Sequence, residues 1–206
     1  MYSRTLVSFV RHGEVHNPQE VYYGRLPGFH LSEKGVRQAT TVSRLLRRKK
    51  LGAVFSSPLL RARQTASAIL TAHPELALQQ SKLLLEVHSP YDGCPLSELI
   101  ERNWDLYSIA PRGYEQPSDI LKRATKFLSL ARRRYAGQHV VAVTHGDVIA
   151  FLILWARQVP VNAKNKEDLQ VWGLQDKYPA PGSLLTVAFK TAAPDEIPDL
   201  NYQRIS

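Results

Sequence analysis

The segment His139–Thr144, with the sequence HVVAVT, constrains the fold more than any other stretch of the chain. It is nearly continuous in valine, and such a run forms a strand that is buried on both faces. Strands of this kind occur in parallel sheets that are covered by helices on both sides. A sheet enclosed between two layers of helices is therefore the first expectation for this chain.

Strand and helix patterns alternate along the sequence. Strands are predicted over residues 5–10, 52–56, 82–86, 139–144 and 183–190, and helices over 32–48, 57–70, 95–107, 117–135 and 148–156. This alternation predicts an α/β fold with three layers, α/β/α, around a mostly parallel central sheet. Residues 158–182 are predicted to be irregular, and a C-terminal tail is predicted over 191–206. A chain of 206 residues suits one buried core, so one domain is expected over 1–206.

Reactive side chains follow the predicted strands. The strand over 5–10 and the strand over 139–144 each lead into a His-Gly pair, at His12 and at His145. The strand predicted over 82–86 ends on Glu86. Because the carboxyl ends of parallel strands meet at one edge of a sheet, these three side chains are expected to converge on one cleft.

Two arginines are expected in the same cleft. Arg11 precedes His12, and Ser57 and Pro58 are predicted to begin the next helix as its N-cap and first residue, which puts Arg61 in the first turn. A guanidinium matches phosphate oxygens with two parallel hydrogen bonds, and a helix N-terminus also favours an anion. An imidazole can attack phosphorus, and a carboxylic acid can protonate the departing oxygen. These residue types predict a phosphoryl-transfer site.

Five blocks of sequence occur in a suggestive order: VRHGEVHN, LSEKGVRQA, SSPLLRARQTA, LLLEV and AVTHGDVI. Over roughly residues 5–155 they resemble the histidine phosphatase superfamily, also called phosphoglycerate mutase-like. The resemblance implies the phosphoglycerate mutase-like fold and a phosphohistidine intermediate. It implies His12 as nucleophile, Glu86 as proton donor, and a phosphate pocket of Arg11, Arg61 and His145. Family positions that contribute to phosphate or substrate binding are occupied in this chain by Asn17, Gly24 and Arg25.

The chain also departs from the family pattern. The segment after Glu86, VHSPYDG, is short where the mutases carry a long insertion, and this favours a phosphatase. The stretch between Gly24 and Leu31 is longer than the family pattern. Asp147 stands where a small residue is usual, and we expect it either to cap the following helix or to orient His145.

Three functions remain open at this point. The first is hydrolysis of small phosphorylated metabolites, the second is mutase-type phosphotransfer, and the third is a phospho-ligand-binding module without turnover. The physiological substrate and the oligomeric state stay open. His16, His30 and His88 lie on predicted cleft loops where they could line a pocket, whereas His73 is expected at the surface or at a strand edge.

Charge and composition exclude several partners. The net charge of +9 is spread over both halves of the chain. Its densest runs, Arg47–Lys50 and Arg132–Arg134, fall at predicted helix ends where cations face water, so nucleic acid is not an expected partner. No apolar run approaches the roughly 20 residues of a membrane span, and no signal peptide is recognisable. A cytoplasmic location without membrane partners is predicted, and the single Cys94 suits a reducing compartment.

A metal site is not expected. The sequence contains no His-x-His or His-Glu-x-x-His spacing, and Arg11 beside His12 would repel a cation. Neither a metal nor another cofactor is therefore predicted.

Overall fold

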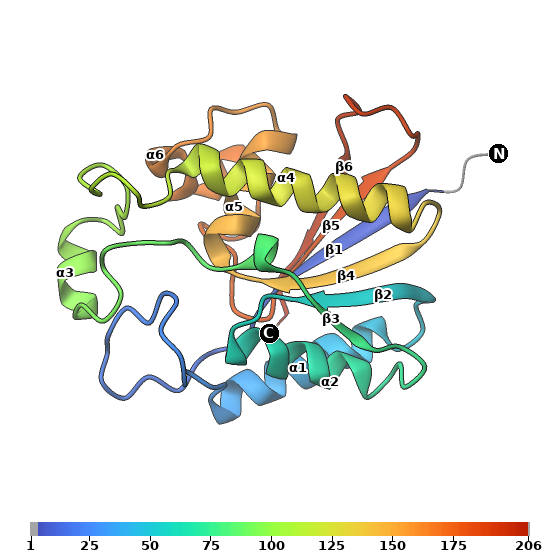
Figure 1. The fold of residues 1–206 in the computed structure, drawn as a ribbon, viewed down its shortest axis with the longest axis horizontal. Helices are drawn as coiled ribbons and strands as arrows, with labels where there is room; N and C mark the ends of the chain where they lie inside the picture. The colour runs from blue at the N-terminus through green and yellow to red at the C-terminus, as the bar shows by residue number, and fades with distance from the viewer. Residues whose placement is uncertain (1–3, 206) are drawn as a thin grey trace.

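A computed structural model describes residues 4–205; residues 1–3 and 206 of the predicted domain and tail lie outside that range. Its described part has a central sheet of six strands in the order β3-β2-β4-β1-β5-β6 (Figure 1). The strands are β1 (Thr5–Arg11), β2 (Leu51–Ser56), β3 (Leu78–Gln80), β4 (His139–Thr144), β5 (Leu184–Phe189) and β6 (Asp199–Gln203). The first four are mutually parallel, and β5 and β6 pair antiparallel. The mostly parallel sheet is confirmed.

Helices cover both faces of this sheet (Figure 1). One layer consists of α1 (Glu33–Leu46) and α2 (Leu60–Leu70), and the other of α4 (Pro117–Arg134) and α5 (Gly146–Ala156). Alternate β4 side chains enter opposite cores: Val140 and Ala142 join the α4/α5 core, and Val141 and Val143 join the α1/α2 core. All four are fully buried, which is why the strand is almost continuous in valine. The three-layer α/β/α fold is confirmed.

The third strand lies earlier than predicted. β3 is Leu78–Gln80, and the strand expected over 82–86 is wrong, because Lys82–Leu84 forms the 3₁₀ turn η1. Ser81 Oγ accepts a hydrogen bond from Leu83 N at 3.3 Å, which starts this turn, and the side chain of Leu84 is fully buried. A short leucine run fits a strand or a turn equally well, and here the capping serine decides.

Two helices differ from their predicted bounds. α2 begins at Leu60 with Leu59 as its N-cap, because the Ser57 hydroxyl lies 2.9 Å from His145 Nε2 instead of capping the helix. α3 (Leu96–Glu101) is shorter than the predicted helix over 95–107. It ends before Asn103 and Trp104, whose left-handed φ angles of 50° and 57° cannot continue a right-handed helix.

The C-terminal region contains more regular structure than expected. The segment predicted to be irregular includes α6 (Ala163–Lys166) and the 3₁₀ helix η2 (Leu169–Trp172), and the predicted tail contributes β6 to the sheet. His73 is 4% exposed, with Nε2 3.1 Å from Leu46 O, which corrects its expected surface position. Within residues 4–205, none of the helices has the length and apolar character needed to cross a membrane.

Candidate active site

The two catalytic-candidate histidines lie together because β1 and β4 are adjacent and parallel. Arg11 and Thr144 are register partners at the carboxyl ends of these strands. The next residues, His12 and His145, therefore leave the sheet side by side, and His12 N donates to Thr144 O at 3.1 Å. The ring centroids are 5.2 Å apart, and the side chains are 1% and 0% exposed.

The glycine after each histidine permits close packing. A Cβ on Gly13 would lie 2.4 Å from the carbonyl oxygen of Gly35 on α1, and a Cβ on Gly146 would lie 2.2 Å from the Tyr178 hydroxyl. Both distances are too short for any side chain. Gly13 N also donates to Thr65 Oγ1 at 3.2 Å, which ties the end of β1 to α2. The repeated His-Gly pair thus reflects two tightly packed turns that hold the imidazoles in place.

His12 presents the lone pair of one ring nitrogen toward the cleft, where Arg61 lies. Its Nδ1 lies 2.8 Å from Gly13 O, and since a carbonyl only accepts, Nδ1 carries the hydrogen. Nε2 is then unprotonated, and it accepts from Arg61 Nε at 3.2 Å. Burial, together with the charges of Arg61 and Arg11, lowers the pKa of His12 well below 6.5. The imidazole is therefore neutral and nucleophilic at neutral pH.

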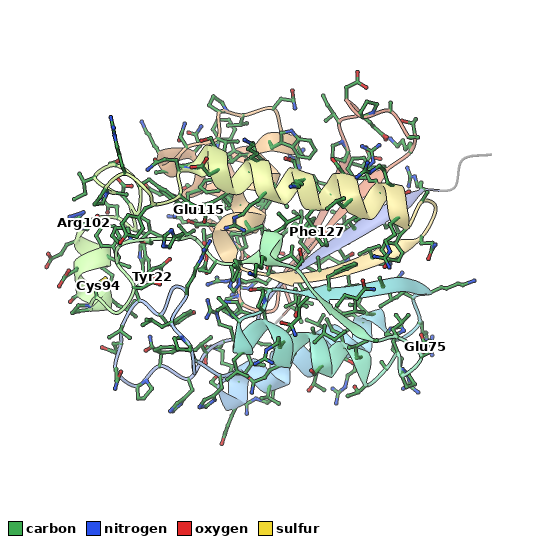
Figure 2. All side chains as sticks on the ribbon, viewed as in Figure 1. Tyr22, Glu75, Cys94, Arg102, Glu115 and Phe127 are labelled. Atoms are coloured by element: carbon green, nitrogen blue, oxygen red, sulfur yellow. The ribbon has the colours of Figure 1, made fainter. Side chains whose placement is uncertain are left out.

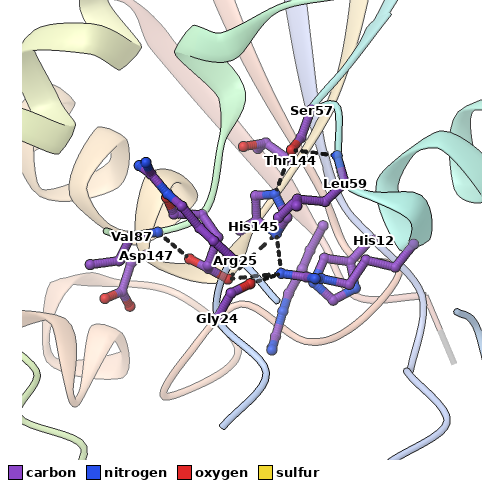
Figure 3. Close-up of polar contacts among 12 residues, drawn as sticks. His12, Gly24, Arg25, Ser57, Leu59, Val87, Thr144, His145 and Asp147 are labelled. Atoms are coloured by element: carbon purple, nitrogen blue, oxygen red, sulfur yellow. Dashed lines mark hydrogen bonds and ion pairs between the residues drawn. The ribbon is translucent and has the colours of Figure 1, made fainter. Parts of the chain in front are cut away.

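Arg61 occupies the centre of the site. It is fully buried, and its Nη2 donates to Gly24 O at 2.7 Å and to His145 Nδ1 at 3.4 Å. Figure 3 labels these two acceptor residues, Gly24 and His145. The Tyr23 ring lies 4.7 Å from the guanidinium carbon. Within residues 4–205, its one ion pair is with Glu86 Oε2, 3.9 Å away. A buried cation so weakly paired favours the entry of a further anion.

His145 is the N-cap residue of α5 and is also neutral. Its Nδ1 accepts from Arg61, so Nε2 donates to Ser57 Oγ at 2.9 Å. Burial, then the charges of Arg61 and His12, lowers its pKa well below 6.5. The helix N-terminus beneath it is electropositive, so His145 lies where negative charge on a bound group is stabilised.

Glu86 faces both histidines across a short gap. Its Oε2 lies 3.4 Å from His145 Nδ1, and its Oε1 accepts from Val87 N at 2.9 Å. The side chain is 12% exposed. Burial raises the pKa of Glu86, and the opposing charge of Arg61 only partly offsets this effect. A carboxyl group that holds its proton closer to neutral pH suits general acid catalysis.

The backbone around Glu86 is fixed from three directions. Thr144 Oγ1 donates to Leu84 O at 2.8 Å, which anchors the preceding 3₁₀ turn to β4. Arg123 Nη2 on α4 and Arg25 Nε donate to Glu86 O at 3.3 and 2.8 Å. These contacts bring Glu86 to the site although no strand ends there.

Arg25 was predicted to bind substrate, but its side chain is engaged within the protein. Besides its bond to Glu86 O, its Nη2 forms an ion pair with Glu115 Oε2 at 2.9 Å. Arg123 Nε binds the other oxygen of Glu115 at 2.8 Å. These contacts hold the segment that carries Glu86, and substrate binding by Arg25 stays a prediction.

Asn17 and Gly24 also make internal contacts. Asn17 Nδ2 donates to Val21 O at 2.9 Å, and its Oδ1 accepts from Val21 N at 3.4 Å, so the amide closes its own loop. Gly24 offers its carbonyl to Arg61. Its φ is +30°, and a Cβ at this position would lie 1.7 Å from Asp92 Oδ1, so a larger residue here would be strained and would displace the Asp92 side chain.

Arg11 retains an available donor. Its guanidinium lies 5.2 Å from the centroid of the Tyr178 ring, and Nη1 donates to Pro179 O. Its Nε is buried without a hydrogen-bond partner within residues 4–205. Because an unsatisfied buried N–H is costly, this atom marks a place where a ligand oxygen would be stabilised.

Asp147 does neither of the things expected of it. Its hydrogen bonds within residues 4–205 go to Lys166 Nζ at 2.9 Å, to Tyr178 OH at 2.6 Å and to Tyr107 OH, not to His145 or to the α5 backbone. Burial by itself would raise the pKa of Asp147, but Lys166 and the two hydroxyls outweigh it and lower the pKa. In the sequence, the only sign of this ion pair was a carboxylate on an otherwise apolar helix. A buried carboxylate needs a partner, but the sequence does not show which residue that partner is.

The other cleft histidines lie apart from this centre. The exposed rings of His16 and His30 stack at 5.1 Å, and the exposed His88 packs on Tyr114 at 4.8 Å. A cavity of about 500 Å³ adjoins the site and is lined partly by Arg11 and Glu86. None of these three histidines is among its lining residues within 4–205.

Three groups in the site could in principle ligate a metal. One ligand atom each from His12, Glu86 and His145 lie within 4.8 Å of one another. However, Arg61 donates hydrogen bonds to both imidazoles in that same space. A guanidinium there repels a cation and attracts an anion, so the donor set fits a phosphoryl group better than a metal ion.

The fold and the site together define a phosphatase: buried imidazoles, arginines and one carboxyl group at the carboxyl edge of a mostly parallel sheet. The chain belongs to the histidine phosphatase superfamily (branch 1), whose family model matches residues 7–174.

Three known proteins are similar to this chain. An uncharacterized protein of Mycobacterium tuberculosis is 40% identical over 154 residues, covering 70% of this chain and 75% of the relative. Phosphoserine phosphatase 1 of Hydrogenobacter thermophilus is 31% identical over 145 residues, covering 66% and 68%. The mycobacterial glucosyl-3-phosphoglycerate phosphatase structure matches with a TM-score of 0.76 at 20% identity over 97% of each chain, which shows the shared fold.

Proposed function

We propose that this phosphatase hydrolyses small phosphomonoesters through a phosphohistidine on Nε2 of His12. The observation that carries the proposal is the hydrogen bond from Arg61 Nε to that nitrogen, which shows that Nε2 bears a lone pair next to a buried cation. A phosphoryl group that enters here has a nucleophile on one side and a guanidinium beside its oxygens.

In the first step, the His12 Nε2 lone pair forms a bond to phosphorus, and the bond from phosphorus to the ester oxygen breaks. Arg11 and Arg61 stabilise the phosphoryl oxygens as charge grows on them, and the electropositive N-terminus of α5 at His145 adds to this effect. Glu86 transfers its proton to the departing oxygen, so an alcohol leaves. The raised pKa of Glu86 supports this role, because the group then holds a proton to give.

In the second step, water replaces the alcohol. The Glu86 carboxylate takes a proton from this water, whose oxygen attacks phosphorus while the phosphorus–nitrogen bond breaks. The electron pair returns to Nε2, inorganic phosphate leaves, and Glu86 is again protonated. One carboxyl group thus serves as acid and then as base, as microscopic reversibility permits.

The experiment that tests the proposal is a panel of phosphomonoesters assayed with the purified wild type and with His12→Ala. The wild type is expected to release inorganic phosphate from several esters, and His12→Ala from none. A second alcohol added to the reaction distinguishes hydrolysis from phosphotransfer, since a mutase would transfer the phosphate to it. Release that is equal in both proteins would refute the proposed nucleophile.

Arg61→Ala is expected to lower kcat by roughly 10²–10³-fold, the usual loss when one preorganised donor to a developing oxyanion is removed. Arg63→Ala is the matched control, because Arg63 lies two residues along the same helix with an exposed side chain. Circular dichroism and a melting curve verify that both variants fold. A folded Arg61→Ala protein with wild-type kcat would remove Arg61 from the proposed machinery.

Activity is expected to persist after exhaustive chelation with EDTA, because the arginines provide the positive charge that a metal would otherwise supply. Orthovanadate, which adopts the five-coordinate geometry of the reacting phosphoryl group, is expected to inhibit competitively. Both effects are measured with one chromogenic ester. If EDTA abolished activity and a single divalent ion restored it, His12, Glu86 and His145 would have to be reconsidered as metal ligands.

A further inference from the structure

The cavity beside the phosphoryl site has mainly apolar walls. It begins where the phosphoryl site ends, because Arg11 and Glu86 line both. Its remaining walls come from separate segments of the chain and consist largely of aromatic and aliphatic side chains: Tyr22, Tyr23, Leu96, Trp104, Leu106 and Tyr178. A volume of about 500 Å³ accommodates a leaving group larger than a simple alcohol.

The aromatic walls are anchored to the rest of the fold. Tyr22 lies beside Cys94 on the segment next to α3 (Figure 2), and its backbone N donates to Cys94 O at 2.8 Å. Burial raises the pKa of Tyr22 and of Tyr178 well above 10, so both hydroxyls stay uncharged. Trp104 is 43% exposed and forms the outer part of the wall.

The cations that line this cavity are already engaged. Among the described lining residues they are Arg11, which serves the phosphoryl group, and Lys166. Lys166 Nζ lies 3.0 and 2.9 Å from the two oxygens of Asp147, and the side chains are 5% and 4% exposed. This buried ion pair is neutral as a unit. The exposed Glu167 adds a negative charge at the rim.

We infer that this cavity selects phosphomonoesters whose leaving group is uncharged and aromatic or aliphatic. The inference rests on the proposed function and specifies its substrate class. An aryl or alkyl group gains by leaving water for these walls and can stack on the tyrosine and tryptophan rings. A carboxylate or a second phosphate would lose its hydration without finding a free cation among the lining residues, and it would lie near the negative charge of Glu167.

The first test compares kcat/KM for phenyl phosphate and 4-carboxyphenyl phosphate, whose leaving groups have similar basicity and differ in charge. The wild type is expected to prefer phenyl phosphate by about tenfold or more. The same preference is expected for 2-phenylethyl phosphate over 3-phosphoglycerate. Equal kcat/KM values within each pair would overturn the inference.

The second test uses variants of the lining. Trp104→Ala is expected to lower the ratio of kcat/KM for phenyl phosphate to that for methyl phosphate by about tenfold, mainly through KM. Ile109→Ala is the matched control, because Ile109 is 63% exposed on the same segment and does not line the cavity. A ratio unchanged by Trp104→Ala would show that the aromatic wall does not bind the leaving group.

The third test removes the negative charge that neutralises the buried Lys166. Asp147→Asn leaves Lys166 without its counter-charge, so the ratio of kcat/KM for 4-carboxyphenyl phosphate to that for phenyl phosphate is expected to rise. Because this buried change could impair folding, Glu167→Gln at an exposed position provides a second variant with the same expected direction. A folded variant of either kind that leaves the ratio unchanged contradicts the electrostatic part of the inference.

Failure of the inference and failure of the proposed function give different results. Hydrolysis that depends on His12 but is indifferent to leaving-group charge and size overturns only the inferred selectivity. Absence of hydrolysis for every ester, or full activity in His12→Ala, overturns the proposed function itself.

Discussion

His12→Ala is expected to form no phosphoenzyme and to lose turnover on the order of 10⁶-fold, the size of loss seen when another covalent enzyme is deprived of its nucleophile. The physical reason is the orientation of the imidazole: Gly13 O holds the hydrogen on Nδ1, so Nε2 is the nitrogen that faces the cleft with a lone pair. Rapid quenching with ³²P-labelled phenyl phosphate should trap an adduct in the wild type that is labile in acid and stable in base.

The matched control for this experiment is His16→Ala. His16 lies four positions further along the same loop region, is exposed, and stacks on His30 rather than facing Arg61. This variant is expected to form the adduct at the wild-type rate. An adduct of unchanged amount in His12→Ala would place the nucleophile on another residue.

Glu86→Gln is expected to slow phosphoenzyme formation from 2-phenylethyl phosphate by roughly 10²–10⁴-fold, the usual contribution of general acid catalysis. The alkoxide that leaves from this ester is strongly basic and needs a proton. The same variant should slow 4-nitrophenyl phosphate much less, because nitrophenolate is already a stable leaving group. With the nitrophenyl ester the variant should accumulate phosphohistidine, since no carboxylate remains to activate water.

Single-turnover kinetics on both esters measure these effects, with Glu98→Gln on the exposed surface of α3 as control. Equal slowing of the two esters without any accumulated intermediate would mean that Glu86 only supports the structure. The proton would then have to come from a different group.

The pH profile provides an independent measurement of the same roles. Glu86 must be protonated in the first step, so kcat/KM should fall as pH rises through its raised pKa. His12 must be neutral to attack, so kcat/KM should fall at low pH only below the range of an ordinary imidazole, because its pKa is lowered. Glu86→Gln is expected to remove the fall on the alkaline side and to leave the acidic side in place.

The strands and helices that carry the site were largely predictable, because their periodicity is local. The alternation of β4 side chains between two cores follows from the valine run itself, and the order of strands and helices predicted the layers. Where local signals were ambiguous, prediction failed: the leucines after Ser81 form a 3₁₀ turn, and Ser57 contacts His145 instead of capping α2.

The partners of charged side chains were the least predictable features. The ion pair of Arg25 is with Glu115, 90 positions away in the sequence. Asp147 was expected to act on its own helix or on His145, but it binds Lys166, 19 positions later, and two tyrosines. Nothing within a few residues of Arg25 or Asp147 identifies these partners.

The sequence by itself determined that His12 and His145 each follow a buried strand and that Arg61 lies near the start of a helix, because strand alternation and helical spacing are visible among neighbouring residues. The tertiary structure decided that these two strands are adjacent. Only the tertiary structure decided which nitrogen of His12 faces the cleft and how Glu86 reaches it without a strand. It also decided that the cation of Lys166 is neutralised beside the cavity. Such contacts depend on how distant segments pack, and packing follows from the fold as a whole rather than from any local pattern.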